Sequence, residues 1–136
     1  MAEATRQLGL EASLIVHGQD GLDEISPVAT TDACCLQNGE IRSIKLSPND
    51  FGFDALATSD IAPAENMEEA AALIQEAISD PQSKRFLAVL PNAAAALVVS
   101  GHATSWEHGA ALAREAVENG KASRLLEQLK VVSHAE

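Results

Sequence analysis

The fold of this chain depends on the stretch Ala12-Ser13-Leu14-Ile15-Val16-His17, which ends at Gly18. A continuous apolar run that ends at a glycine is typical of a strand buried on both faces, as in a parallel sheet. Ligands of open α/β sheets bind just beyond the carboxyl ends of such strands. The polar loop from Gly18 to Ser26 follows directly, so it is the first place to look for a functional site.

Two short strand-like runs come next, Asp32–Leu36 and Ile41–Leu46. Between them lies Gln37-Asn38-Gly39-Glu40. Asn-Gly supplies the positive φ angles that a tight type I′ turn requires, so we expect a β-hairpin. The segment Ser47-Pro48-Asn49-Asp50-Phe51-Gly52 then breaks the strand pattern.

The remaining sequence is helical in pattern. Residues 2–8 predict a short helix, and the chain from Ala64 onward predicts about four more. The first of these ends at Asp80-Pro81 and has an apolar face at helical spacing, made by Met67, Ala70, Ile74 and Ala77 or Ile78. The second, 83–100, is apolar nearly all round, which predicts a central buried helix closed by Gly101.

The last two helices complete the order of elements. Thr104 and Glu107 have the spacing of a capping box at the start of a helix that stops at Gly120. A final helix is expected from about Lys121 to Leu129. One parallel-type strand, a hairpin and four helices do not complete any common α/β fold, because a parallel strand needs parallel neighbours. The sequence therefore predicts an α/β segment of something larger.

Composition excludes several classes of partner. The chain has 136 residues, of which 46% are hydrophobic and 3% aromatic, so its core is expected to consist of Ala, Leu, Ile and Val. A formal net charge of −11 argues against nucleic acid or an anionic membrane as a partner. No apolar stretch is long enough to span a bilayer. The adjacent Cys34 and Cys35 are expected to be reduced thiols, which favours a cytoplasmic location.

The candidate chemistry lies in the loop after the first strand. Asp20, Asp23 and Glu24 place three carboxylates within five residues, beside two glycines. Such ligands suit Mg²⁺, although a solvated acidic loop has the same composition. His17 could reach a ligand or could be a hydrogen-bonded residue at a strand end. Asn92, inside the apolar helix, is expected to tie that helix to a neighbouring backbone, with substrate contact as the alternative.

One family shares these motifs. The stretch 17–26 closely resembles the signature of anthranilate phosphoribosyltransferases, and the likeness continues in family order through 38–41, 47–52, 92–97 and 109–126. The resemblance implies an α/β fold, namely a partial C-terminal segment of the nucleoside phosphorylase/phosphoribosyltransferase α/β domain. Residues 1–136 would be the C-terminal portion of a glycosyltransferase-family-3-like domain, with the N-terminal helical domain and the phosphate loop absent.

The resemblance also implies a reaction. The family transfers a phosphoribosyl group from phosphoribosyl pyrophosphate to anthranilate in tryptophan biosynthesis, and its Mg²⁺-binding Asp-Glu pair maps onto Asp23 and Glu24. No catalytic residue and no further cofactor-binding residue is expected. The implied partners are the two substrates, the missing N-terminal half or a separate chain that carries it, and a second copy in a homodimer once the enzyme is complete. The isolated chain is expected to be inactive. A truncated, inactive descendant that acts as a binding or interaction module is the alternative.

Overall fold

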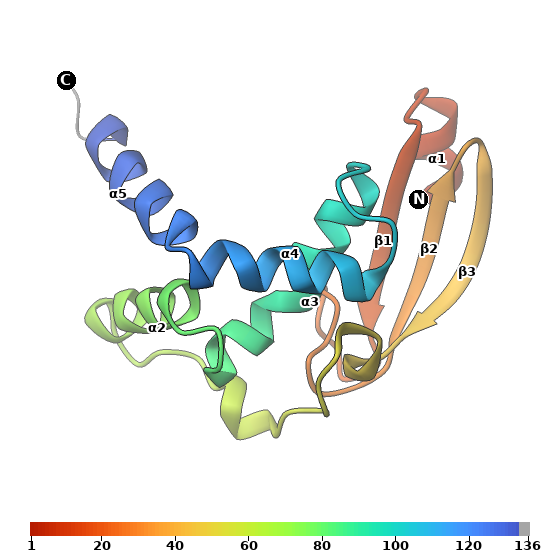
Figure 1. The fold of residues 1–136 in the computed structure, drawn as a ribbon. Coiled ribbons are helices and arrows are strands. Elements are labelled where there is room, and N and C mark those ends of the chain that lie inside the picture. The colour runs from red at the N-terminus through yellow and green to blue at the C-terminus, as the bar shows by residue number, and fades with distance from the viewer. Residues whose placement is uncertain (134–136) are drawn as a thin grey trace.

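The computed structural model describes residues 1–133, in which a three-stranded sheet stands beside a group of helices (Figure 1). The strands β1 (Ala12–Gly18), β2 (Thr31–Gln37) and β3 (Glu40–Leu46) lie in the order β1-β2-β3. Both pairs of strands are antiparallel. The expected N-terminal helix is present as α1 (Ala2–Gln7), which contacts β1 and β2.

The hairpin between β2 and β3 confirms the prediction from Asn-Gly. Gln37 and Glu40 are partners in the register, so the loop has only two residues. Asn38 has a φ of 51° and Gly39 a φ of 80°, as the type I′ turn requires.

β1 differs from the prediction of a strand buried on both faces in a parallel sheet. It pairs antiparallel with β2, and most of its residues are half-buried. The chain reverses in the loop after β1, where the Gln19 N–H donates to the Thr30 carbonyl oxygen at 2.9 Å. Within residues 1–133 the other edge of β1 pairs with no strand. The apolar run predicted the strand itself correctly, but not its burial on both faces, and apolarity carries no information on the direction of the neighbouring strand.

Four helices follow the hairpin, as expected, after two short 3₁₀ turns. The turns are η1 (Pro48–Phe51) and η2 (Thr58–Ile61), and the helices are α2 (Met67–Ser79), α3 (Lys84–Val99), α4 (Trp106–Glu118) and α5 (Lys121–Ser133). The predicted capping box of Thr104 and Glu107 is wrong. Ser105 is the N-cap of α4, and its side chain accepts a hydrogen bond from the His108 N–H. The helix begins one residue later than the spacing indicated, because two adjacent hydroxyl residues can both cap.

The core lies between the inner face of the sheet and α3. Leu90 and Ala94 of α3 are fully buried in it. α4 crosses α3 closely at Gly109, where an added Cβ would lie 2.6 Å from the Ala94 carbonyl oxygen. The small side chains of these helices therefore set how near the two backbones approach.

The prediction that α3 is buried all round holds for only part of its surface. Val89 is 48% exposed within the described chain. The predicted apolar face of α2 is also largely open, since Met67 is 85% and Ile74 55% exposed, whereas Ala77 is buried.

No helix within residues 1–133 has the length and apolarity needed to cross a membrane. Cys34 and Cys35 are both free thiols and half-buried.

Candidate functional site

The loop after β1 begins with a tight turn that packs closely against Gly18. The Gly18 N–H donates to the Leu22 carbonyl oxygen at 2.8 Å, and the Gly21 N–H donates to the Gly18 carbonyl oxygen at 2.9 Å. A Cβ at Gly18 would lie 2.5 Å from Asp20 Oδ1 and 3.2 Å from the Ser26 Cβ. Close packing of Asp20 and Ser26 against the Gly18 backbone therefore fixes the start of the loop.

Ser26 organises the inner side of this loop. Its side chain is fully buried, and its Oγ donates to Asp20 Oδ2 at 2.7 Å while accepting from the N–H groups of Val28 and Ala29. The Ser26 N–H donates to Thr31 Oγ1 at 2.9 Å. The fold itself therefore holds the Asp20 carboxylate in place. In this respect Asp20 differs from Asp23 and Glu24, the other two carboxylates of the acidic loop.

Asn92 fastens the other side of the loop to α3. The Ile25 N–H donates to Asn92 Oδ1 at 3.0 Å, and Asn92 Nδ2 donates to the Ile25 carbonyl oxygen at 3.3 Å. The same amide nitrogen donates to Glu24 Oε2 at 3.4 Å. The predicted tie between this helix and a neighbouring backbone is confirmed, and the tie also reaches the side chain of Glu24.

Asp23 and Glu24 are exposed between these two anchored points. Within residues 1–133, no group of three or more His, Cys, Asp or Glu side chains is arranged to hold a metal ion. Mg²⁺ does not need such a group, because it commonly binds one or two carboxylates and completes its octahedron with waters and phosphate oxygens. An exposed pair of carboxylates on an anchored loop has the donor chemistry for an ion shared with a phosphorylated ligand.

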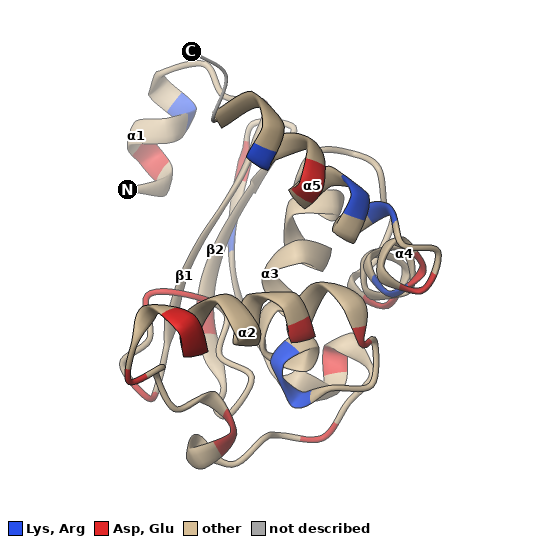
Figure 2. Ribbon diagram, turned by 90° about the vertical axis from the view of Figure 1, so that its left-hand side faces the viewer, with Lys and Arg blue, Asp and Glu red and all other residues tan. Residues whose placement is uncertain are grey.

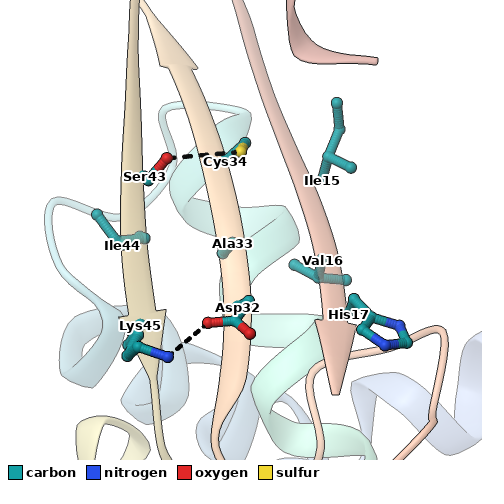
Figure 3. Close-up of a pocket in the computed structure, with 9 residues that line it drawn as sticks. All are labelled: Ile15, Val16, His17, Asp32, Ala33, Cys34, Ser43, Ile44 and Lys45. Carbon is teal, nitrogen blue, oxygen red and sulfur yellow. Dashed lines mark hydrogen bonds and ion pairs between the residues drawn. The ribbon is translucent and has the colours of Figure 1, made fainter. Parts of the chain in front are cut away.

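His17 lies in the sheet rather than in the loop. It is exposed at the end of β1 and is in register with Asp32 of β2, which in turn is in register with Lys45 of β3. Figure 3 shows Asp32 directed toward Lys45, and the Lys45 Nζ lies 2.7 Å from Asp32 Oδ1. The Lys45 ammonium, together with the Gln19 amide, lowers the pKa of Asp32. Within this row, Asp32 and Lys45 form an exposed ion pair. The pair lies beside an open hollow of about 560 Å³ on the sheet face.

The sequence did not reveal the hydrogen bonds of Ser26 or the ion pair of Asp32 with Lys45. A serine side chain often accepts hydrogen bonds from the N–H groups two and three residues later in the chain. The presence of a serine is therefore weak evidence by itself that it organises a site. The ion pair could be found only from the register, because 13 residues separate its partners. Once the Asn38-Gly39 turn fixes the register, Asp32 falls opposite Lys45.

Comparison with known proteins agrees with this fold. Residues 1–123 match the family described as "Glycosyl transferase family, a/b domain". Anthranilate phosphoribosyltransferase of Agrobacterium fabrum is 37% identical over 134 residues, covering 98% of this chain and 39% of that protein. This chain thus spans about two-fifths of the length of the curated relative that it matches.

Two solved structures give the same result. The anthranilate phosphoribosyltransferase of Thermus thermophilus superposes with a TM-score of 0.78 at 30% identity, covering 93% of this chain and 37% of that one. The Saccharomyces cerevisiae enzyme in complex with PRPP and Mg superposes with a TM-score of 0.72 at 28% identity, covering 84% of this chain and 33% of that one. The resemblance and the α/β fold class expected from the sequence are both confirmed. This chain belongs to the glycosyl transferase family, through its a/b domain.

Proposed function

We propose that this chain is the metal-binding part of an anthranilate phosphoribosyltransferase, in which Asp23 and Glu24 hold Mg²⁺ against the pyrophosphate of phosphoribosyl pyrophosphate. The complete enzyme would transfer the phosphoribosyl group to anthranilate in tryptophan biosynthesis. The chain would act as the C-terminal portion of a larger or split enzyme, whose other portion carries the phosphate loop and the helical domain.

The observation that carries this proposal is the anchored, exposed Asp23-Glu24 pair in a chain of this family. Ser26 and Asn92 hold the loop on both sides, so its ends are fixed relative to β1 and α3. The Asn92 amide contacts Glu24 directly and thereby restricts that carboxylate. A relative matched at a TM-score of 0.72 carries PRPP and Mg in its solved structure.

The chain's own groups would contribute binding and orientation. Glu24 and Asp23 would act as oxygen ligands, and the Asn92 tie would limit the rotational freedom that Glu24 loses when it binds the ion. Bound Mg²⁺ would neutralise negative charge on the departing pyrophosphate. No residue of this chain is assigned as a nucleophile, since the attacking group is the amine of anthranilate.

A chimeric enzyme tests this function. This chain would replace the 134 matched residues of the Agrobacterium fabrum enzyme. We expect Mg²⁺-dependent formation of N-(5-phosphoribosyl)anthranilate, and we expect the isolated chain to form none under the same conditions. The double variant Asp23→Asn, Glu24→Gln should lower turnover and raise the Mg²⁺ concentration needed for half-maximal rate.

The matched control is Glu68→Gln with Glu69→Gln, an adjacent exposed carboxylate pair in the first turn of α2. It removes the same formal charge and should leave the Mg²⁺ dependence unchanged. Equal effects of the two double variants would remove the site assignment. A folded chimera that forms no product would favour the alternative of an inactive descendant.

A further inference from the structure

The exposed carboxylates Asp23 and Glu24 lie in a loop whose backbone is held on both sides of the pair. Figure 2 shows Asp and Glu residues over much of the chain, so negative charge alone does not distinguish this pair. After the pair, the Ile25 N–H and carbonyl oxygen both bond to the side-chain amide of Asn92, at 3.0 and 3.3 Å. Before the pair, both backbone groups of Leu22 are bonded as well. The support after the pair comes from α3, whereas the support before it comes from within the loop.

The support before the pair depends on Asp20. The Leu22 carbonyl oxygen accepts from the Gly18 N–H at 2.8 Å, and the Leu22 N–H donates to Asp20 Oδ1 in a long hydrogen bond of 3.5 Å. The other oxygen of that carboxylate, Oδ2, accepts from the Ser26 hydroxyl at 2.7 Å. A distance of 2.7 Å is typical of a strong bond from a hydroxyl to a carboxylate. Asp20 therefore joins the two ends of the segment 20–26, and the exposed pair lies between these ends.

Ser26 is in turn fixed to the sheet. Its side chain is fully buried, and its N–H donates to the side chain of Thr31, the first residue of β2, at 2.9 Å. Two backbone N–H groups of the following turn donate to its Oγ, which uses both lone pairs of the hydroxyl. The one hydrogen of the hydroxyl is therefore directed at Asp20. These bonds occupy the Asp20 carboxylate within the loop, so it is less available to a metal ion than Asp23 or Glu24.

We propose that Asp20 is a positioning residue of the metal site and not one of its ligands. Through Ser26, it holds the backbone before Asp23 in place, and Asn92 does the same for the backbone after Glu24. Mg²⁺ accepts little deviation from octahedral geometry, so carboxylates whose backbone is fixed beforehand lose less freedom when they bind it. This inference rests on the proposed function, in which the exposed pair holds Mg²⁺. It adds a role for the third carboxylate of the loop.

Metal binding by the 136-residue chain tests this role without catalysis. The probe is Mn²⁺ in the presence of pyrophosphate, and its affinity is measured from the relaxation of water protons. Ser26→Ala removes the hydroxyl that bonds to Asp20 and changes no charge. We expect it to weaken Mn²⁺ binding by about three- to tenfold, because loss of a group that bonds directly to a metal ligand typically costs roughly 10–100-fold and Ser26 acts one step further away.

Two substitutions of Asp20 separate positioning from direct ligation. Asp20→Asn and Asp20→Ala remove the same charge, but only the asparagine side chain keeps an oxygen that can accept the Ser26 hydroxyl hydrogen. A positioning residue predicts that Asp20→Ala binds Mn²⁺ about threefold or more weakly than Asp20→Asn. A metal ligand predicts that both variants lose the affinity alike, because a neutral amide replaces a charged ligand poorly.

Ser83→Ala is the matched control for a loss of stability. Ser83 is also a buried serine, and its side chain accepts from the Phe86 N–H at the start of α3. Its removal should lower the urea midpoint, as the loss of a helix cap does, and should leave the Mn²⁺ affinity of the folded chain unchanged. Nitrogen-15 relaxation gives a second measurement without metal. The amide order parameters of residues 22–25 should fall in Ser26→Ala and stay unchanged in Ser83→Ala.

Three results would overturn the proposal while leaving the proposed function in place. They are an unchanged Mn²⁺ affinity in Ser26→Ala, equal affinities of Asp20→Asn and Asp20→Ala, and an equal loss of affinity in Ser83→Ala and Ser26→Ala. An unchanged affinity in the Asp23→Asn, Glu24→Gln variant would have a different meaning. It would refute the metal site of the proposed function, on which this inference rests.

Discussion

Replacing Asn92 with alanine removes the tie between α3 and the loop that carries Asp23 and Glu24. The side-chain amide accepts from the Ile25 N–H at 3.0 Å and donates to the Ile25 carbonyl oxygen at 3.3 Å. Ile25 is only 1% exposed and belongs to the core. Truncation therefore leaves two backbone groups of a buried residue without their side-chain partners.

The expected cost follows from these contacts. A buried polar group that loses its partner costs about 1–3 kcal/mol. Two groups are affected, but Asn92 is half-buried, so water can reach part of the vacated space. Alanine also has the better helix propensity, which offsets roughly 0.5 kcal/mol. The net loss in the free energy of unfolding should be about 1–3 kcal/mol.

Urea denaturation of the 136-residue chain, followed by circular dichroism, measures this loss. Asn49→Ala is the matched control, because Asn49 is exposed and its side-chain amide donates to the exposed Asp54 at 3.3 Å. That control should change the free energy of unfolding by less than about 0.5 kcal/mol. Equal effects of the two substitutions would refute the idea that Asn92 supports the loop.

Three further perturbations test other parts of the structure. Gly109→Ala should destabilise the chain by about 1–3 kcal/mol in urea, although Gly→Ala stabilises an ordinary helix, because the new Cβ meets the α3 backbone at 2.6 Å; a gain in stability would contradict this close crossing. Ser26→Ala should cost about 1–3 kcal/mol and release Asp20, and an unchanged urea midpoint would argue against its organising role. Lys45→Met should raise the pKa of Asp32 toward its ordinary value of 3.8 in an NMR titration. Because folding lowers the pKa of Asp32, the ion pair contributes its full stabilisation of the fold at pH values above the ordinary pKa. This contribution is lost as the pH falls through the pKa of the folded state. An unchanged pKa in the variant would contradict the pairing.

Local signals predicted local structure well. Asn38-Gly39 determined the hairpin, because few other dipeptides adopt two successive positive φ angles. The expected role of Asn92 followed from a polar side chain in an apolar helix, since a buried amide must find partners. The loop was predicted as the candidate site because it directly follows a strand.

Non-local features escaped the sequence. The apolar β1 indicated a buried strand, but only the reversal of the loop makes it antiparallel to β2. Thr104 and Ser105 both qualify as helix caps, and in the structure Ser105 caps α4. The apolarity of α3 on all sides predicted complete burial, but Val89 is 48% exposed within residues 1–133.

The most direct test of the central claim is paramagnetic line broadening by Mn²⁺, used in place of Mg²⁺ with pyrophosphate present. The account predicts that low Mn²⁺ broadens amide resonances of residues 18–26 first. The Asp23→Asn, Glu24→Gln variant should lose that broadening, and the Glu68→Gln, Glu69→Gln variant should keep it. Broadening spread over the acidic surface, or centred on α2, would contradict a metal site at Asp23 and Glu24.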